Sequence, residues 1–586
     1  MKSTTTNDQS LIVRRSRSAF FGAAVGDALG WPFEGRAASL PKNAENLGYI
    51  DWEKKSGGRF NPHLECIAAG NYSDDTQLLL ATGRSLTTQT EWWRNFAEVE
   101  LPFWTTYERG GGGATKRAAA VWTTGSAPWL KENKGAPGKY FEAGGNGVAM
   151  RVLPHCVGSV SDSSFHDIAS SIFANGVTTH GHPRALAGAL AYGYCCWQAL
   201  RLSDTLEYGY LIQQTLDCRA EWSVMPDISA YWPTWKDAAL SYAPDYLDQW
   251  EIAVNEMIAL LKVALTAMHK GALVSQWSVL KELGAYNKKI GGAGTVSAAS
   301  AIFMASRYAA SPLEGLIGAA TAEGTDTDTI ASMTGAILGA VSGQEWLSKF
   351  RNQTQDIDYL EYMADAVAAG NYSHNNQELR APVTKSALQN FAKELEKRPQ
   401  SIKALPNGLK IDRVSNVTPP SNTQKNLAIL WKIESFKGPT FYIKKPFRAP
   451  KVEHAQKEFS IEAGTENSLG FTISSIGISL KVSNLMQSRN FYETLLGLQA
   501  TGHSSKSIRF GTVLALKEDV EKLPATTAIR IFLQVSNIIS CHKKMQDHHI
   551  EVQALNDQGK AIVFECVDPD GYVIEIFERV QHPSRA

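Results

Sequence analysis

The sequence has few cysteines, and none of them are spaced to bind a metal or to form a redox pair. Its 586 residues include 7 cysteines, an odd number, and no two of them are separated by two residues. Disulfide-stabilised secreted domains and zinc knuckles carry more cysteines, at regular spacings. We therefore expect free thiols in a reducing compartment, and hence a cytoplasmic protein.

Net charge and long apolar runs are also absent. The 58 basic residues balance the 58 acidic ones, so no overall field draws the protein toward nucleic acid or an anionic membrane. No run approaches the roughly 20 apolar residues of a membrane span. Arg14, Arg15 and Arg17 precede the apolar run 19–25 as in a signal peptide, but Asp27 interrupts that run. We expect no membrane segment, and local groups must hold any anionic ligand.

Apolar and aromatic residues are plentiful. Hydrophobic residues make up 44% of the chain, with 15 Trp, 19 Tyr and 22 Phe, which is ample for a packed interior. Because single hydrophobic cores stop growing at roughly 250 to 300 residues, a chain of this length predicts at least two domains.

The first part of the chain is rich in helix-forming, small-residue stretches. Examples are ALAGALAYGYCCWQAL (185–200) and SAASAIFMASRYAA (297–310). Glycine-rich loops separate them at 110–113, 144–147, 291–294 and 324–329, where backbone can approach a ligand closely. We predict an all-α domain over residues 1–372, with its functional site on these loops.

Two further segments follow. Prolines and polar residues increase after 372, so residues 373–470 are predicted to form a linker with a helix at about 385–396 and a small β segment. In residues 471–586, ISLKVSNL (478–485) recurs as IFLQVSNI (531–538), and each copy is followed by a helical pattern and further strands. This repeat predicts an α+β domain made of a duplicated βαβββ unit.

Two acidic clusters are the strongest chemical signal. YSDDTQ contains Ser73, Asp74, Asp75 and Thr76, and GTDTDTI contains Asp326, Asp328 and Thr329. Such residues before an apolar stretch are common helix N-caps. However, each cluster holds more acid than a cap needs, and hydroxyl and carboxylate oxygens are the ligands of hard cations. Capping and a dinuclear Mg²⁺ site are both open interpretations, and the excess acid favours the metal.

Three other elements could contribute to a site. Gly22, Gly26 and Gly30 share one face of a predicted helix around Asp27, which indicates close helix packing, and Glu34 follows on a loop as a candidate acid or base. AGGNGVAMR (143–151) is a glycine loop suited to a diphosphate, whereas GGGGATKR (110–117) lacks the nucleotide-binding spacing and is predicted to be a simple loop. His180 and His182 in TTHGHP could be core, cap or ligand-facing residues.

The ordered blocks GAAVGDALGWPFEG, YSDDTQLLL, GGNGVAMRVLP, TTHGHPRA and GTDTDTIASMTGAILGA resemble the ADP-ribosylglycohydrolases over about 350 residues. The resemblance implies a hydrolase that releases ADP-ribose from a modified protein, nucleic acid or small molecule. It implies two Mg²⁺, or Mn²⁺, held by six residues, with catalytic roles for Glu34, on a mobile loop, and Asp75. Thr325 departs from the family's usual glycine. The implied metal ligands are Ser73, Asp74, Asp75, Asp326, Asp328 and Thr329, and the implied substrate-binding residues are Gly145, Asn146, Gly147, Met150, His180 and His182.

The C-terminal repeat is similar to the glyoxalase, or vicinal oxygen chelate, superfamily, through FYETLLGL (491–498) and VDPDGYVIEI (567–576). Of the family's four metal-ligand positions, here Gly477, Arg530, about Ala515, and Glu575, only the last keeps a ligand. We therefore expect no metal in this domain and a role in target recognition or dimerisation. The alternatives are a non-catalytic ADP-ribose-binding module, or a lyase or dioxygenase in the glyoxalase-like domain.

Overall fold

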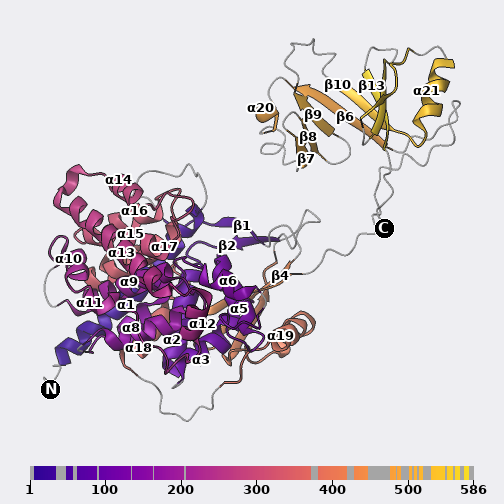
Figure 1. The fold of residues 1–586 in the computed structure, drawn as a ribbon. Helices are drawn as coiled ribbons and strands as arrows, with labels where there is room; N and C mark the ends of the chain where they lie inside the picture. The colour runs from indigo at the N-terminus through magenta and orange to yellow at the C-terminus, as the bar shows by residue number, and fades with distance from the viewer. Residues whose placement is uncertain are drawn as a thin grey trace. The chain divides into compact units, whose positions relative to one another are not determined.

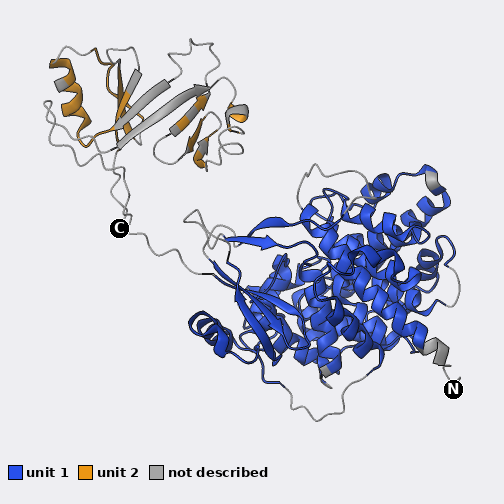
Figure 2. Ribbon diagram, turned by 180° about the vertical axis from the view of Figure 1, so that it is seen from behind, with its two compact units in different colours: residues 1–449 blue, residues 450–586 orange. Residues whose placement is uncertain are grey.

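The computed structural model describes two compact units, which are coloured separately in Figure 2. The first comprises residues 1–449 and the second residues 450–586. The described residues are 6–34, 48–56, 63–88, 91–133, 135–162, 164–202, 206–370, 380–418, 428–446, 475–482, 485–489, 500–504, 507–510, 514–518, 529–547, 551–558, 561–567 and 573–579.

The first unit is mainly helical, as the small-residue stretches predict (Figure 1). Its α-helices are α1 (Thr6–Gly30), α2 (Asp74–Thr88), α3 (Trp92–Arg94), α4 (Leu101–Trp104), α5 (Gly113–Trp122), α6 (Ala136–Phe141), α7 (Leu153–Gly158), α8 (His166–Gly176), α9 (Pro183–Arg201), α10 (Tyr210–Asp217), α11 (Ala220–Ser223), α12 (Trp235–Tyr242), α13 (Tyr246–His269), α14 (Gln276–Glu282), α15 (Gly294–Arg307), α16 (Pro312–Ala320), α17 (Thr327–Ser342), α18 (Ile357–Ala368) and α19 (Lys385–Lys397). Short 3₁₀ or π turns are η1 (Trp31–Phe33), η3 (Asn95–Glu100), η4 (Ala149–Arg151), η5 (Gly271–Leu273), η6 (Glu345–Phe350) and η7 (Pro399–Ser401).

Helices α1 and α17 cross in backbone contact. A Cβ added at Gly22 would lie 2.1 Å from the carbonyl oxygen of Gly335, and one at Gly26 would lie 2.2 Å from that of Ala331. Near the end of α1, the Thr327 hydroxyl donates a 2.9 Å hydrogen bond to the carbonyl of Gly30. The predicted packing role of these glycines is confirmed, and the crossing brings the end of α1 to the start of α17.

Helix α13 is long and apolar enough to span a membrane by length and composition alone. It packs against α9 and α15 in the helical unit. A core helix of a soluble protein passes the same test, so α13 carries no argument for a membrane.

The all-α prediction misses a hairpin in the first unit. Strands β1 (Trp52–Ser56) and β2 (His63–Ile67) pair antiparallel, with Trp52 opposite Ile67. The side chains of β1 alternate between intermediate and exposed positions, the pattern of a strand with one solvated face. This short alternation is hard to detect inside a long helical region.

Of the segment 373–470 that was predicted as a linker, the described residues 380–418 and 428–446 belong to the first unit. Helix α19 matches the predicted helix, and β3 (Ile411–Asn416), β4 (Ala428–Ser435) and β5 (Thr440–Pro446) form an antiparallel sheet in the order β3-β4-β5. Phe441 is buried against Phe103 and Tyr107 of the helical part. The compact unit therefore extends past the expected boundary at 372, because the sheet buries apolar surface on the helices.

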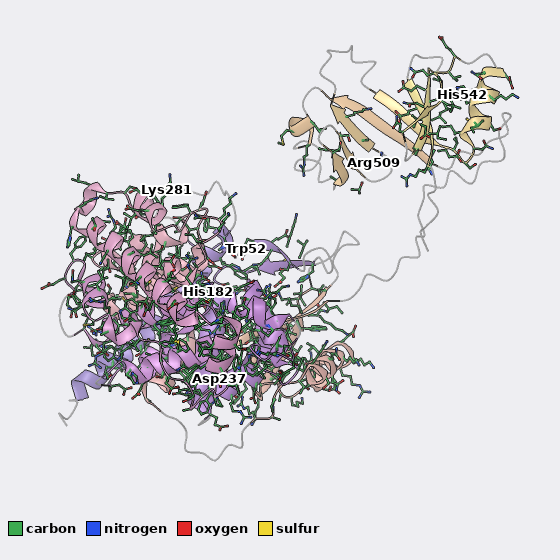
Figure 3. The ribbon with its side chains drawn as sticks, viewed as in Figure 1. Trp52, His182, Asp237, Lys281, Arg509 and His542 are labelled. Atoms are coloured by element: carbon green, nitrogen blue, oxygen red, sulfur yellow. The ribbon has the colours of Figure 1, made fainter. Side chains whose placement is uncertain are left out.

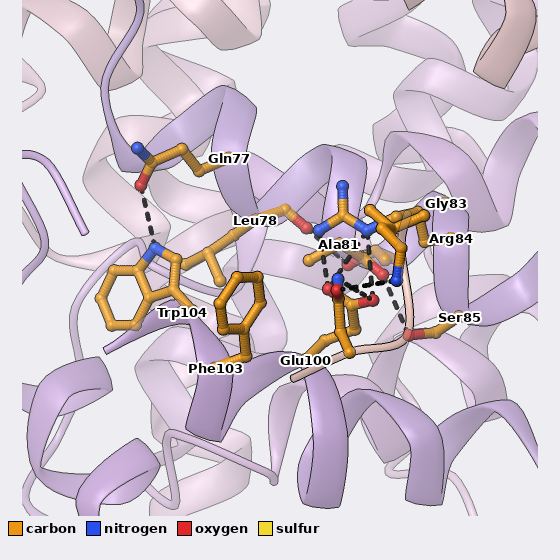
Figure 4. Close-up of polar contacts among 12 residues, drawn as sticks. Gln77, Leu78, Ala81, Gly83, Arg84, Ser85, Glu100, Phe103 and Trp104 are labelled. Carbon is orange, nitrogen blue, oxygen red and sulfur yellow. Dashed lines mark hydrogen bonds and ion pairs between the residues drawn. The ribbon is translucent and has the colours of Figure 1, made fainter. Parts of the chain in front are cut away.

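A buried ion pair reinforces this docking, as Figure 4 shows in part. Arg84 on α2 pairs with Glu100 at 2.6 Å, with both side chains almost fully buried. The side-chain amide of Asn407, which precedes β3, donates a 3.3 Å hydrogen bond to the same Glu100 carboxylate. The helix that begins with the first acidic cluster is thus connected to the segment that carries the sheet.

The second unit contains a mixed sheet in the order β11-β12-β13-β10-β6-β9-β8-β7. Along the chain, β6 (Ser475–Val482), α20 (Leu485–Arg489), β7 (Ala500–Ser504), β8 (Ser507–Phe510) and β9 (Leu514–Glu518) are followed by β10 (Ile529–Gln534), α21 (Ile538–Asp547), β11 (Asn556–Asp557), β12 (Ala561–Val567) and β13 (Val573–Arg579).

The two repeat strands, β6 and β10, are antiparallel neighbours at the centre of this sheet. Position 477 lies opposite 532, and position 532 lies opposite 575 on β13; position 479 lies opposite both 530 and Ala515. Because alternate residues of a strand share a face, the four expected ligand positions fall on one face of the sheet. The motif FYETLLGL and part of VDPDGYVIEI lie outside the described residues.

Candidate metal-binding active site

The first acidic cluster is held at the start of α2 by Asp27 of α1. The buried Asp27 carboxylate accepts hydrogen bonds from the backbone N–H groups of Ser73 and Thr76, both at 2.9 Å, and from the Thr76 hydroxyl at 2.6 Å. These amides are among those that a helix start leaves unpaired. Asp27 therefore caps α2 from a distant helix, which leaves the carboxylates of Asp74 and Asp75 available for other contacts.

The second cluster opens α17 and meets the first directly. The Thr329 hydroxyl donates to Asp75 Oδ2 at 3.3 Å, although the two residues are 254 positions apart in the chain. Asp326 is oriented by the side-chain amide of Asn146, which donates to its Oδ2 at 2.9 Å. The structure thus brings together the two clusters and the glycine loop.

Capping explains only part of these acidic residues. Ser73 Oγ accepts from the Asp75 amide at 3.4 Å, which is a long contact, and the Asp326 side chain makes no capping bond to α17. Asp328 accepts from the adjacent Thr329 amide at 2.9 Å. Asp27 supplies most of the capping at α2.

The clustered carboxyl groups destabilise one another's charged forms. Burial raises the pKa values of Asp74, Asp75 and Asp328 well above their usual range, and neighbouring carboxylates raise them further. In the described part of the chain, the buried Oδ1 of Asp75 accepts no hydrogen bond. An orphaned carboxylate oxygen among other acids is a donor set that fits a hard divalent cation.

The arrangement is not a preformed metal cage. Within the described ranges, no three or more His, Cys, Asp or Glu side chains are grouped as a metal site requires. The oxygen-rich ligand set predicted from the sequence, which includes the hydroxyls of Ser73 and Thr329, therefore remains a prediction that rests on donor chemistry.

Glu34 lies at the edge of the acidic cluster, directly after η1. Its side chain is exposed, yet many protein atoms surround its carboxyl group. This desolvation, with the added charge of Asp326, raises the pKa of Glu34, while Lys54 on β1 acts in the opposite direction. The loop that follows Glu34 lies outside the described residues, so its predicted mobility stays a prediction.

The two glycine loops at 144–147 and 291–294 hydrogen-bond to each other beside the acidic cluster. The backbone amide of Asn146 donates to the Gly292 carbonyl, and the backbone amide of Gly294 donates to the Gly144 carbonyl, both at 3.0 Å. Gly145 forms an isolated bridge with Ala293. Met150, buried on η4, follows the same loop and donates its amide to the Asn146 carbonyl at 3.3 Å. These contacts fix the loop through its backbone.

The two histidines have different environments. His180 is buried, with Nδ1 2.8 Å from the Thr179 hydroxyl, and a Cβ added at Gly147 would lie 2.9 Å from its Cε1. Burial, assisted by nearby arginines, lowers the pKa of His180 to about 3, so its ring is neutral. His182, which is labelled in Figure 3, caps α9 by accepting from the Arg184 amide at 3.1 Å.

Sequence reasoning missed Arg151, the last residue of AGGNGVAMR. Its fully buried guanidinium donates to the Gly147 carbonyl at 2.8 Å, to Asn175 Oδ1 at 2.7 Å and to the Thr179 hydroxyl at 2.9 Å. Burial lowers the pKa of Arg151 to about 9. Arg151 thereby connects the glycine loop to the turn that carries His180. The sequence shows only that an arginine ends the motif AGGNGVAMR.

Trp31 on η1 was also missed. Its indole Nε1 is buried and, within the described ranges, has no hydrogen-bond partner. A Cβ added at Gly110 would lie 3.1 Å from this nitrogen and 2.9 Å from Asp74 Oδ1. Trp52 on β1, labelled in Figure 3, packs edge-on against Trp31 at 5.1 Å between ring centroids. The β1–β2 hairpin therefore borders the acidic cluster.

Comparison with known proteins identifies a family for the helical part. The family model described as ADP-ribosylglycohydrolase matches residues 8–377. A solved structure titled "ADP-ribosylglycohydrolase-related protein complex" is 20% identical, covers 62% of this chain and 99% of its own, and has a TM-score of 0.38. Comparison with curated proteins gave no match.

Smaller solved structures match about a fifth of the chain. One is a glyoxalase/bleomycin resistance protein/dioxygenase superfamily member from Vibrio splendidus 12B01, 16% identical, covering 18% of this chain and 97% of its own, with a TM-score of 0.16. Another is titled an NAD-dependent benzaldehyde dehydrogenase from Legionella pneumophila, 24% identical, covering 18% of this chain and 100% of its own, with a TM-score of 0.16. These similarities are too weak to assign a fold or an activity.

Proposed function

Because the chain belongs to the ADP-ribosylglycohydrolase family, we propose that its first unit hydrolyses the N- or O-glycosidic bond between ADP-ribose and a modified target. The observation that carries the proposal is the convergence of two acidic clusters at a glycine loop, through the contacts of Asp75 with Thr329 and of Asn146 with Asp326. Carboxylates placed near a sugar stabilise the positive charge that develops at its anomeric carbon.

Two divalent cations, Mg²⁺ or Mn²⁺, are the proposed cofactors. Bound there, they would supply Lewis-acid polarisation of substrate oxygens and lower the pKa of a water. The residues proposed to hold them are Ser73, Asp74, Asp75, Asp326, Asp328 and Thr329. Asp27 and Asn146 orient this set, because one fixes the start of α2 and the other fixes the Asp326 carboxylate.

Glu34 is the proposed proton-transfer group. Desolvation and Asp326 raise its pKa toward the range in which a carboxyl group can both hold and release a proton. Its position at the exposed edge of the cluster allows contact with a bulky leaving group. Asp75 is the second proposed catalytic carboxylate, through its unpaired Oδ1.

The glycine loop is proposed to receive the ADP-ribosyl group. Gly145 and Gly147 have no side chains, Arg151 donates a hydrogen bond to the Gly147 carbonyl, and the His180 ring lies next to Gly147. Met150, whose backbone amide donates to the Asn146 carbonyl, and His182, which lies next to Gly144, are further proposed contacts. Backbone of this kind suits a diphosphate.

The second unit is proposed to contribute recognition of the target or assembly, as a degenerate glyoxalase-like domain without a catalytic metal. The support is its repeat and the loss of ligand types at positions 477, 515 and 530. Elemental analysis of the full-length protein with its first-unit ligands mutated should then find no tightly bound Zn²⁺, Fe²⁺ or Mn²⁺.

Release of free ADP-ribose tests the proposed activity. The purified protein should release it, with Mg²⁺ present, from at least one of a panel of arginine-, serine- and nucleic-acid-linked substrates, and Asp328→Asn should not. Calorimetry should also find ADP-ribose binding in the wild type. Binding without release from any substrate would favour a binding module, and neither binding nor release would refute the proposal.

A further inference from the structure

Strand β5 contacts the helical part at Asp356, a residue that also binds the tyrosine next to the first acidic cluster. Its Thr440 donates to the carboxylate of Asp356 through the backbone amide at 2.8 Å and through the hydroxyl at 2.7 Å. The same carboxylate accepts from the Tyr72 hydroxyl at 2.8 Å. Tyr72 directly precedes Ser73, so β5 is two hydrogen bonds away from the cluster.

A second contact of β5 involves Lys444. Its Nζ lies 2.9 Å from Glu65 Oε1 and 3.5 Å from Glu108 Oε1, and the Lys444 side chain is only 9% exposed. The backbone amide of Lys444 also donates to the Thr106 carbonyl at 2.9 Å. Lys444 therefore joins the β1–β2 hairpin to the loop that begins at residue 108.

Arg109 extends this network to the acidic cluster. Its buried guanidinium donates to Glu65 Oε2 at 3.2 Å and to Asn71 Oδ1 at 3.1 Å, and it lies 3.6 Å from the ring centroid of Tyr442 on β5. Although burial acts to raise it, the hydrogen bond from His63 and the charges of Lys444 and Arg109 lower the pKa of Glu65. Two cations and two carboxylates thus compensate one another.

The loop fixed by this network passes directly beside Asp74. Gly110 has a φ of +94°, and a Cβ there would lie 2.9 Å from Asp74 Oδ1. Asn71, Tyr72 and Gly110 are thus all positioned by residues that β5 contacts. A complete buried ion-pair network adds little net stability, whereas removal of one partner leaves an uncompensated buried charge.

We propose that β5 is a positioning element of the acidic site and that Lys444 is its principal positioning residue, acting through Glu65, Glu108 and Arg109 on the segments that flank Asp74. This rests on the proposed function, since the geometry being held is that of the proposed metal ligands. The β3–β5 sheet then helps to hold the proposed metal ligands in place.

If Lys444 positions the site, its removal should weaken cation binding, whereas its charge alone predicts that removal strengthens cation binding. Lys444 compensates Glu108, whose charge contributes to raising the pKa of Asp74. Removal of that positive charge would make the cluster more negative and strengthen cation binding. Loss of positioning would weaken it, so the sign of the change separates the two effects.

The test uses full-length Lys444→Met, with Lys445→Met as the matched control and Lys444→Arg as the rescue. Lys445 is the next residue on β5, and it pairs with Glu396 on α19 at the surface. Mn²⁺ affinity is measured by calorimetry. Hydrogen exchange of peptides covering 71–80 and 105–113 is measured in metal-free protein.

We expect Lys444→Met to weaken Mn²⁺ binding about tenfold, which is the lower end of the loss found when a direct partner of a metal ligand is removed, because Lys444 acts on the ligands only through other residues. The variant should also lose exchange protection in both peptides. Lys445→Met should change neither, and Lys444→Arg should restore most of both. Unchanged or tighter Mn²⁺ binding by Lys444→Met, or unchanged protection, would overturn the proposal.

A second variant and the wild-type measurement cover the cases in which Lys444→Met cannot be interpreted. If Lys444→Met does not fold, Thr440→Val removes one hydroxyl donor to Asp356 and should lower protection over 71–80; unchanged protection there would overturn the role of β5. If the wild type itself binds no Mn²⁺, the proposed metal-dependent function fails, and the exchange measurement alone decides whether β5 positions these segments.

Discussion

Substitution of Gly26 by alanine tests whether the site depends on the close crossing of α1 and α17. The added Cβ would lie 2.2 Å from the carbonyl oxygen of Ala331 and 2.8 Å from the amide nitrogen of Ser332. Both atoms are backbone, so no side chain can rotate away and the helices must separate. Asp27, the next residue, would then move from the α2 amides that it caps.

The expected magnitude follows from two opposed effects. Overpacking costs about 1 to 3 kcal/mol, occasionally more, whereas alanine in a helix is favoured over glycine by about 1 kcal/mol. A clash with rigid backbone belongs at the upper end, so we expect a net loss of about 2 kcal/mol in the free energy of unfolding. The rate of ADP-ribose release should also fall, even at temperatures where the variant is folded, because the two acidic clusters separate along with the helices.

The control is Gly138→Ala in α6, where an added Cβ would meet only the Tyr242 ring, at 3.9 Å. This variant should be as stable as the wild type or more so, by up to about 1 kcal/mol. Denaturant unfolding measures both variants, and ADP-ribose release measures their activity. Wild-type stability and activity in Gly26→Ala would refute the crossing as the basis of the site.

Asp75→Ala and Asp328→Ala should each abolish ADP-ribose release while circular dichroism stays close to that of the wild type; substantial turnover in either would exclude that residue from the proposed role. Burial and neighbouring acids raise the pKa values of Asp74, Asp75 and Asp328, so the folded state keeps protons that the unfolded chain releases above about pH 4. The melting temperature of metal-free protein should therefore fall as pH rises from about 4 toward neutrality, and Mg²⁺ should raise it more near neutral pH than in acid; an opposite slope in calorimetry would contradict this assignment. A chain that ends at Ala449 should still cleave a small ADP-ribosylated substrate, whereas one that ends at residue 372 should aggregate, because it loses the contacts of Phe441, Thr440 and Lys444; equal solubility and activity of the two would show that the sheet is dispensable.

The helical architecture could be predicted because its signals are local. Gly22 and Gly26 recur at helical spacing, and apolar residues alternate in period two within the repeat segments 478–485 and 531–538, so α1, β6 and β10 follow from the pattern. The docking of β3–β5 could not be predicted in this way. It depends on Phe441, Thr440 and Lys444 meeting partners more than 80 residues away in the chain, which no local periodicity records.

In the candidate site, too, residues with a local sequence signal could be predicted, and residues whose roles depend on distant partners could not. Asp75 and Asp328 were recognisable because they exceed what a helix cap needs, and the contact between Asp75 and Thr329 brings their clusters together. The capping role of Asp27 and the bridging role of Arg151 were not predicted, because the sequence does not show whether a single charged residue is buried. Their roles arise from distant partners, the α2 amides for Asp27 and the Gly147 carbonyl for Arg151.

Metal dependence is tested most directly by measuring ADP-ribose release from a modified substrate by the full-length protein, first with Mg²⁺, then with excess chelator, and then with Mg²⁺ restored. We expect release with Mg²⁺, its loss with chelator, and its recovery when Mg²⁺ returns. Release at an undiminished rate in chelator would contradict the proposed role of the acidic clusters as metal ligands.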